Sequence, residues 1–211
     1  MNREILFPTP VYFKMVKDPQ KLNKYLFPLI KAWSKKDKGE EKTNAGGGWH
    51  SPIDMNHKKE YQPLTDELFN MQEEIYKDYG MEPKPGLGNM WANVNYPGSY
   101  NKQHIHPNSQ WSGVYYVKVP NNSGSLFVED PRPGPNHLLP RRVKEIPKAL
   151  WHVVTYPAIE GQMIMFPAWL RHGVNPFFGE GERRTFSANL NVAPQVKVTG
   201  DHYRKTREEL E

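Results

Sequence analysis

Residues 163–174 read Met-Ile-Met-Phe-Pro-Ala-Trp-Leu-Arg-His-Gly-Val. The apolar run at the start of this stretch is typical of a buried β-strand, and the proline that follows it marks the end of the strand. His172 comes just after the buried strand, a position that corresponds to the rim of a β-barrel, where ligands commonly bind. The stretch therefore predicts a β-core with a histidine at its rim.

Similar short β-type runs, bounded by Pro, Gly and Asn, fill the chain after Gly80. We predict strands at 90–96, 102–106, 112–119, 125–129, 151–156, 163–166, 172–175 and 183–192. Before Gly80, apolar residues at helical spacing predict helices at 19–34 and 63–79. Pro28 should kink the first helix or end it early, and Gly80 should terminate the second. The fold class is therefore α+β, with a β-sandwich or barrel that carries the site.

The length of 211 residues indicates a single domain. We expect an N-terminal segment with supporting helices (1–87), a β-core (88–194) and a charged C-terminal tail (195–211). Residues 6–16 should be extended, and 35–48 should form a loop. The connection 138–149 is irregular and is a candidate cover for the barrel mouth.

Composition excludes several classes of protein. The chain has no cysteine, which excludes a disulfide scaffold, a thiolate metal site and a cysteine nucleophile. We find no signal peptide and no apolar run long enough to span a membrane, so a cytoplasmic location is expected. The net charge of +5 is spread along the chain without a nucleic-acid-binding signature.

Two histidines, His104 and His106, alternate on a predicted strand, so their side chains should point to the same side. His172, from a distant strand, can complete a three-point metal site. Alternatively, the first pair is simply part of a polar surface face. As metal ligands the imidazoles must be neutral, so metal binding should weaken as the pH falls through the histidine range.

The last predicted strand alternates a polar set (Arg183, Thr185, Ser187, Asn189) with a set that is apolar after its first member (Arg184, Phe186, Ala188, Leu190). We favour a polar face that points into the barrel, although the opposite orientation is also compatible with the pattern. Arginine then suits a carboxylate, which its planar fork holds through two parallel hydrogen bonds. An open metal site beside a carboxylate clamp is the equipment of a non-haem iron oxygenase.

Other residues are weaker candidates. Tyr115 and Tyr116 are adjacent in a strand and face opposite ways, so only one of them can serve the site. Trp91, Asn93 and Asn95 share one face of the first core strand and either line the pocket or pack in the core.

Taken in order, the motifs resemble a known family. They are His-x-His (104–106), Ser-Gly-Val-Tyr-Tyr (112–116), Ser-Gly-x-Leu-x-x-x-Asp-Pro (123–131), Phe-Pro-x-Trp-Leu-x-His-Gly-Val (166–174), Arg-x-Thr (183–185) and Asn-x-Asn-Val (189–192). This series resembles the 2-oxoglutarate- and iron(II)-dependent oxygenases, especially a microbial and phage group that is distantly similar to prolyl hydroxylases. The resemblance covers 88–194 and includes 6–11.

The resemblance implies a double-stranded β-helix, a jelly-roll of two facing four-stranded sheets with flanking helices. It places His104, His106 and His172 on one Fe(II). It makes Arg183 the partner of the distal carboxylate of 2-oxoglutarate, with Thr185 and Tyr116 assisting. The implied reaction uses O2, releases succinate and CO2, and hydroxylates an unidentified substrate, for which peptidyl proline is one candidate. A phage-encoded chain would act in the cytoplasm of the host.

One residue departs from the family pattern. The usual second ligand is Asp or Glu, whereas this chain has His106. Either His106 binds the metal, which we favour because it is already aimed correctly, or Asp130 or Glu129 completes the site. Two further hypotheses stay open: a cupin-like three-histidine dioxygenase that does not use 2-oxoglutarate, and a non-catalytic β-sandwich binding module.

Overall fold

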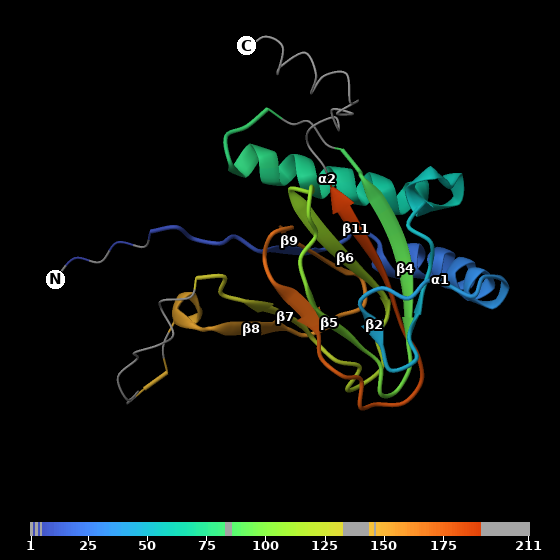
Figure 1. Ribbon diagram of the computed structural model, residues 1–211. Coiled ribbons are helices and arrows are strands. Elements are labelled where there is room, and N and C mark those ends of the chain that lie inside the picture. The colour runs from blue at the N-terminus through green and yellow to red at the C-terminus, as the bar shows by residue number, and fades with distance from the viewer. Residues whose placement is uncertain are drawn as a thin grey trace, which may run out of the picture.

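Two antiparallel β-sheets face each other, and two helices cover the outside of the larger one (Figure 1). The computed structural model describes residues 2, 4, 6–82, 86–132, 144–145 and 147–190. The larger sheet has the order β1 (Tyr12–Met15), β9 (Gln162–Pro167), β6 (Trp111–Lys118), β11 (Arg183–Leu190), β4 (Asn89–Asn95) and β3 (Trp49–His50). The smaller sheet has the order β2 (Asn44–Ala45), β5 (Tyr100–His104), β10 (His172–Val174), β7 (Leu126–Glu129) and β8 (Val153–Tyr156).

The eight predicted core strands are all present, as β4 to β11. They divide evenly, with β9, β6, β11 and β4 in the larger sheet and β5, β10, β7 and β8 in the smaller one. This arrangement confirms the double-stranded β-helix. The short strands β2 and β3 were not predicted, because two-residue strands in a glycine-rich segment carry no alternating pattern. β2 lies within the predicted loop 35–48.

Within the described residues, the helices are α1 (Pro19–Lys36) and α2 (Gln62–Asp78), and the short 3-10 turns are Met55–His57, Lys59–Tyr61 and Lys148–Leu150. The apolar stripe of α2 packs on the larger sheet through Leu64, Leu68, Met71 and Ile75, all buried in one cluster. Each such side chain contributes about 1.5–3 kcal/mol when it is fully buried. The helices therefore seal the outer face of the sheet whose inner face lines the site.

The ends of the helices differ in how well the sequence predicts them. α1 continues through Pro28 to Lys36, so the expectation that Pro28 ends the helix early is wrong. Burial of Leu26 and Ile30 on either side of the proline holds the helix against the sheet. Gly80 ends α2 as predicted: its φ is 66°, its N–H donates to the carbonyl of Lys77, and the N–H of Met81 donates to Tyr76. These two bonds form a Schellman cap.

The alternation of β11 separates the helix-covered core from the interior between the sheets. Phe186, Ala188 and Leu190 lie in the core cluster beneath the helices, whereas Arg183, Thr185 and Ser187 line the space between the sheets. The polar face therefore points inward, as predicted.

Several expectations concern residues outside the described ranges. These are the tail 195–211, the end of the last predicted strand at 191–192, and most of the connection 138–149. Within the described residues, no helix combines the length and the apolar character that crossing a membrane requires.

Candidate metal centre and its pocket

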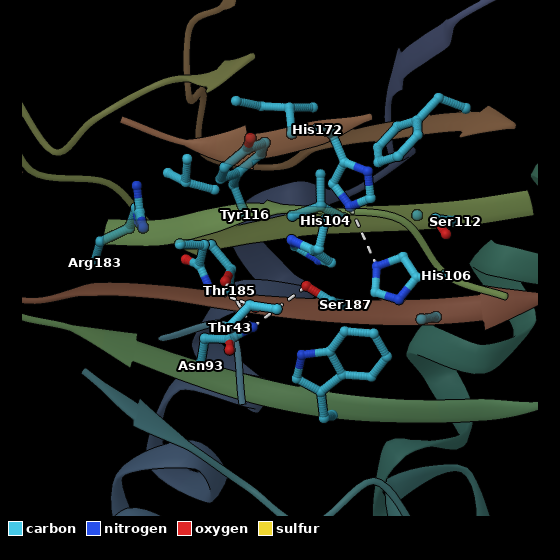
Figure 2. A pocket seen from close by; sticks show the side chains of 18 residues that line it. Thr43, Asn93, His104, His106, Ser112, Tyr116, His172, Arg183, Thr185 and Ser187 are labelled. Atoms are coloured by element: carbon cyan, nitrogen blue, oxygen red, sulfur yellow. Dashed lines mark hydrogen bonds between the residues drawn. The ribbon is translucent and has the colours of Figure 1, made fainter. Parts of the chain in front are cut away.

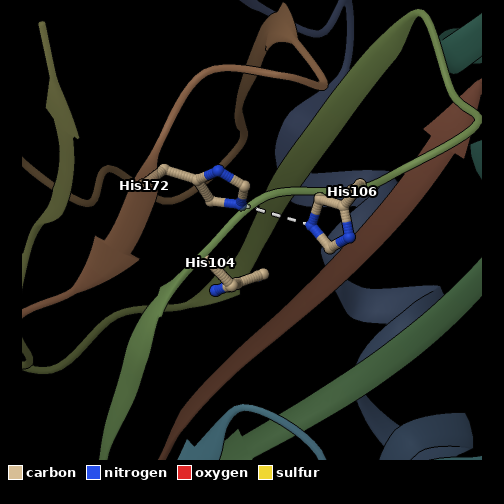
Figure 3. Close-up of side chains that lie close together, drawn as sticks. All are labelled: His104, His106 and His172. Carbon is tan, nitrogen blue, oxygen red and sulfur yellow. Dashed lines mark hydrogen bonds between the residues drawn. The ribbon is translucent and has the colours of Figure 1, made fainter. Parts of the chain in front are cut away.

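Three histidines converge between the two sheets (Figure 3). His104 ends β5 and His172 begins β10, and the two are direct partners in the antiparallel ladder. A ligand nitrogen from each of His104, His106 and His172 lies within 4.8 Å of those of the other two, and Nε2 of His172 is 3.2 Å from Nε2 of His106. Imidazole nitrogens bind divalent metals at about 2.0–2.1 Å, so neighbouring ligands on one ion lie about 3 Å apart. The cluster therefore has the dimensions of a metal site.

His106 lies beyond the end of its strand, so the alternation of side chains along a strand does not explain its position in the cluster. β5 ends at His104 rather than at residue 106, so the predicted strand is displaced. The backbone N–H of His106 instead donates to the carbonyl of Ala168, at 2.9 Å, in the segment that leads to His172. Ile105, between the two histidines, is 45% exposed. This hydrogen bond ties the His106 backbone to the segment just before the third histidine.

Two of the imidazoles are held by backbone carbonyls. His104 Nδ1 lies 2.7 Å from the carbonyl of Lys102, and His172 Nδ1 lies 2.8 Å from the carbonyl of Leu170. Because a carbonyl only accepts, Nδ1 carries the proton in both rings, and each Nε2 keeps its lone pair. Such contacts commonly orient histidines that bind metals.

The imidazoles are neutral in the folded protein. Burial, together with the neighbouring histidines, lowers the pKa of His106 and of His172 to about 3. Burial also lowers the pKa of His104. Neutral imidazoles are the form that a metal ion needs.

These pKa shifts predict how the stability of the metal-free protein depends on pH. Between pH 6.5 and about 3 the unfolded chain binds protons at His106 and His172 that the folded chain does not bind. The free energy of unfolding should therefore decrease as the pH falls through this window. His50, whose pKa is also lowered by burial, adds to the effect. Urea unfolding of the metal-free protein from pH 7 to pH 4 checks this expectation; a flat profile would contradict it.

A buried arginine lies in the same cavity. Arg183 begins β11 and is 2% exposed. Its Nη1 donates to the carbonyl of Ser123 at 2.5 Å, while its Nε has no hydrogen-bond partner among the residues that the structure describes. Burial lowers the pKa of Arg183 to about 10, so the guanidinium is still a cation at neutral pH. Among the ion pairs of the described residues, none includes Arg183.

Tyr116 and Thr185 lie next to this arginine (Figure 2). They are partners in the pairing of β6 with β11, and both are buried. Burial raises the pKa of Tyr116 to about 12, so its hydroxyl keeps its proton and can donate. Tyr115 points the other way, and its hydroxyl donates to Asn23 in α1 at 2.6 Å. Of the two tyrosines, Tyr116 is therefore the one that faces the site.

The pocket has an empty volume of about 590 Å³, part of it open to solvent. Figure 2 shows Arg183 at one end and His106 toward the other. The lining residues also include Trp91 and Asn93, which agrees with the alternative that this face of the first core strand lines the pocket. The side-chain amide of Asn93 donates to Thr185 and Ser187 at 3.5 and 3.3 Å. Asn95 is buried but is not among the lining residues. Thr43 and Asn101 line the pocket and were not predicted; Thr43 lies in a segment with no periodic signal.

The two alternative carboxylate ligands are engaged elsewhere. Glu129 pairs with His152 at 3.1 Å and accepts a hydrogen bond from Gln103. Asp130 pairs with Arg132 at 2.7 Å, and this pairing lowers the pKa of Asp130. In the described part of the chain, neither belongs to the histidine cluster.

Comparison with known proteins gives a family and a fold. Residues 89–189 match the family model described as "Putative 2OG-Fe(II) oxygenase". A prolyl-4-hydroxylase from Pseudomonas putida superposes with a TM-score of 0.61 at 13% identity, over 88% of this chain and 94% of that one. The α-ketoglutarate-dependent epimerase SnoN from nogalamycin biosynthesis gives a TM-score of 0.63 at 14% identity, over 88% and 77% of the two chains.

A prolyl hydroxylase from Trichoplax adhaerens, solved with a peptide fragment of hypoxia inducible factor, gives a TM-score of 0.55 at 13% identity, over 85% and 83% of the two chains. At these identities the structural likenesses establish the fold alone. Among curated protein sequences, no relative is detected.

The fold and the matched residues define an oxygenase domain. Residues 89–189, just under half of the chain, match the domain of the 2-oxoglutarate- and iron(II)-dependent oxygenases. Enzymes of this family use Fe(II), 2-oxoglutarate and O2.

Proposed function

We propose that this oxygenase is a hydroxylase whose iron(II) is held by His104, His106 and His172 and whose 2-oxoglutarate is held by Arg183. The distal carboxylate would lie on the guanidinium, with Thr185 and Tyr116 as further hydrogen-bond donors. The observation that carries this proposal is the position of Arg183: a buried cation without a carboxylate partner among the described residues, in the same cavity as three neutral histidines.

The electrostatics of Arg183 favour an anionic ligand. Burying an unpaired guanidinium is costly, and the unpartnered Nε leaves a further donor unsatisfied. A carboxylate compensates for both, because it can accept two parallel hydrogen bonds from the planar fork. Arg183 and the three histidines line the same pocket, so we expect a dicarboxylic oxo acid to lie with its distal carboxylate at the arginine and its oxo acid end at the metal.

In this proposal the three histidines fix the position of the metal ion and leave part of it accessible to ligands. Three ligands on one side of an ion leave positions for the oxo acid and for O2. Bound iron(II) supplies the activation of O2, a reaction that side chains do not perform. His172 and Tyr116 are both buried, so they lie away from the part of the pocket that is open to solvent.

For the primary substrate we propose peptidyl proline as the first class to test. The structural neighbours include prolyl hydroxylases, but also an epimerase from antibiotic biosynthesis. A panel of proline-containing peptides, free amino acids and nucleotides should be screened for release of succinate coupled to a mass gain of one oxygen in the substrate. Turnover of a small metabolite and not of any peptide would exclude the proline assignment while leaving the reaction class intact.

A direct test of the reaction class is anaerobic addition of iron(II), followed by 2-oxoglutarate. The proposal requires stoichiometric iron and the weak visible charge-transfer band of the chelate. Iron binding without that band would favour a three-histidine dioxygenase that does not use the oxo acid. Binding of neither would favour a non-catalytic module.

The identity of the second ligand leads to a specific prediction. His106→Asp should retain iron(II), because two histidines and one carboxylate form the common facial triad. His106→Ala should lose at least the roughly 10- to 100-fold in iron affinity that is typical when a residue behind a ligand is removed, since here a ligand itself is missing. Titration with iron(II) under anaerobic conditions measures both. Equal affinity of the alanine variant and the wild type would show that His106 is not a ligand.

A further inference from the structure

His106 is held differently from the other two histidines of the cluster. His104 and His172 each meet a backbone carbonyl through Nδ1, whereas His106 Nδ1 meets a side chain, the Asn189 amide nitrogen, at 3.3 Å. Asn189 is buried on β11 and is paired with Ser112 across the ladder to β6. The third imidazole therefore depends on a residue that can present either a donor or an acceptor.

In the metal-free protein the hydrogen bonds run in one direction. Ser112 Oγ donates to Asn189 Oδ1 at 2.9 Å, so the amide nitrogen faces His106. An amide nitrogen only donates, so His106 Nδ1 accepts and the ring carries its proton at Nε2. This Nε2–H then points to the Nε2 lone pair of His172, 3.2 Å away (Figure 3). In this series of hydrogen bonds, from Ser112 through Asn189 and His106 to His172, each donor meets an acceptor.

Metal binding requires the opposite tautomer of His106. Its Nε2 must offer a lone pair to the ion, so the ring proton must lie on Nδ1. The Nδ1–H would then face the N–H group of the Asn189 amide, and two donors cannot form a hydrogen bond with each other. A half-turn of the amide removes the conflict: Oδ1 then accepts from His106, and the amide nitrogen donates to Ser112 Oγ. A serine hydroxyl can serve as donor or acceptor, so the second arrangement is also fully paired.

We propose that Asn189 is a positioning residue that couples metal binding to the tautomer of His106, with Ser112 reversing from donor to acceptor. This inference rests on the proposed function, because it takes His106 as the third ligand. The backbone carbonyls hold the other two imidazoles in the metal-ready tautomer at all times. His106 is therefore the one proposed ligand whose metal-binding tautomer depends on a side chain.

Cobalt(II), which resists oxidation, is a suitable probe. In the cobalt-loaded protein, each histidine bound through Nε2 should give one strongly shifted proton resonance from its Nδ1–H, visible in H2O and absent in D2O. The wild type should show three such resonances. Asn189→Leu should lose or displace one of them, leave the other two in place, and weaken cobalt binding by about 10- to 100-fold.

Asn189→Asp should restore all three resonances and at least wild-type affinity, because a carboxylate accepts from Nδ1–H without needing to turn. Ser187→Ala is the matched control: it lies on the same face of β11 but contacts Asn93 rather than a histidine. It should leave the resonances and the affinity unchanged.

The outcomes distinguish the role of Asn189 from the proposed set of metal ligands. Three unchanged resonances and unchanged affinity in Asn189→Leu would overturn the role of Asn189 while the ligand set stands. Only two exchangeable resonances in the wild type would show that His106 is not a ligand, which overturns the proposed ligand set and the inference together. Failure of Asn189→Asp to restore binding would identify Asn189 as a structural residue.

Discussion

Replacement of Arg183 by alanine is expected to weaken 2-oxoglutarate binding by about 2–5 kcal/mol while iron binding stays nearly unchanged. The carboxylate of the ligand would enter a buried cavity that has lost its only proposed cationic partner. The proposed metal ligands lie on β5, on β10 and just past β5, and none of them is hydrogen-bonded to Arg183. Titration of the chelate band with 2-oxoglutarate at saturating iron(II) measures the loss.

Two variants control this experiment. Arg184→Ala removes the neighbouring arginine, which is equally buried but pairs with Glu182 and packs on Phe27 beneath the sheet. It should reduce the stability of the fold and leave the affinity for 2-oxoglutarate unchanged. Arg183→Lys keeps the charge without the planar fork and should recover only part of the affinity. Equal loss of iron and of 2-oxoglutarate in Arg183→Ala would mean that this arginine is structural.

Substitution of His172 by alanine is expected to abolish stoichiometric iron binding, and with it the turnover of 2-oxoglutarate. His172 contacts both other imidazoles, with ring centroids 4.3 Å from His104 and 5.0 Å from His106. Without it the remaining two nitrogens cannot form a three-point site. Metal analysis after anaerobic loading and desalting gives the stoichiometry, and succinate release gives the turnover.

His50 provides a matched control for this substitution. It is as buried as His172, 4% against 5% exposed, and stacks on Trp91, but it does not belong to the histidine cluster. His50→Gln should keep full iron stoichiometry even if it lowers stability. Wild-type iron content in His172→Ala would remove the metal site from the proposal.

The local sequence predicted most of the architecture. The eight core strands, the apolar stripe of α2 and the glycine that caps it all follow from periodicity and turn residues, which act over a few neighbouring positions. Alternation along β11 predicted that Arg183 and Thr185 lie on the face opposite Phe186 and Leu190. Which of the two faces points inward was decided by the structure, where Phe186 and Leu190 lie beneath the helices. The short strands β2 and β3 were not predicted, because they are defined by their pairing with β5 and β4 and not by a local sequence pattern.

Pro28 is a second case in which tertiary packing, and not the local sequence, decided the structure. Its local preference is to end a helix, yet α1 runs on to Lys36, because packing of the flanking apolar residues on the sheet outweighs the lost hydrogen bond. The sequence indicated the three histidines and Arg183 by residue type and order, and their assignment as ligands stays a prediction.

By itself, the sequence determined which side chains share a face, since alternation along a strand is a property of the backbone. Only the tertiary structure decided which of those faces meet. His104 and His172 become partners through the pairing of β5 with β10, and His106, beyond the end of its strand, is fixed through Ala168. The contact of Asn189 with His106 joins residues 83 positions apart. Such contacts depend on the register and packing of whole sheets, which no short window of sequence contains.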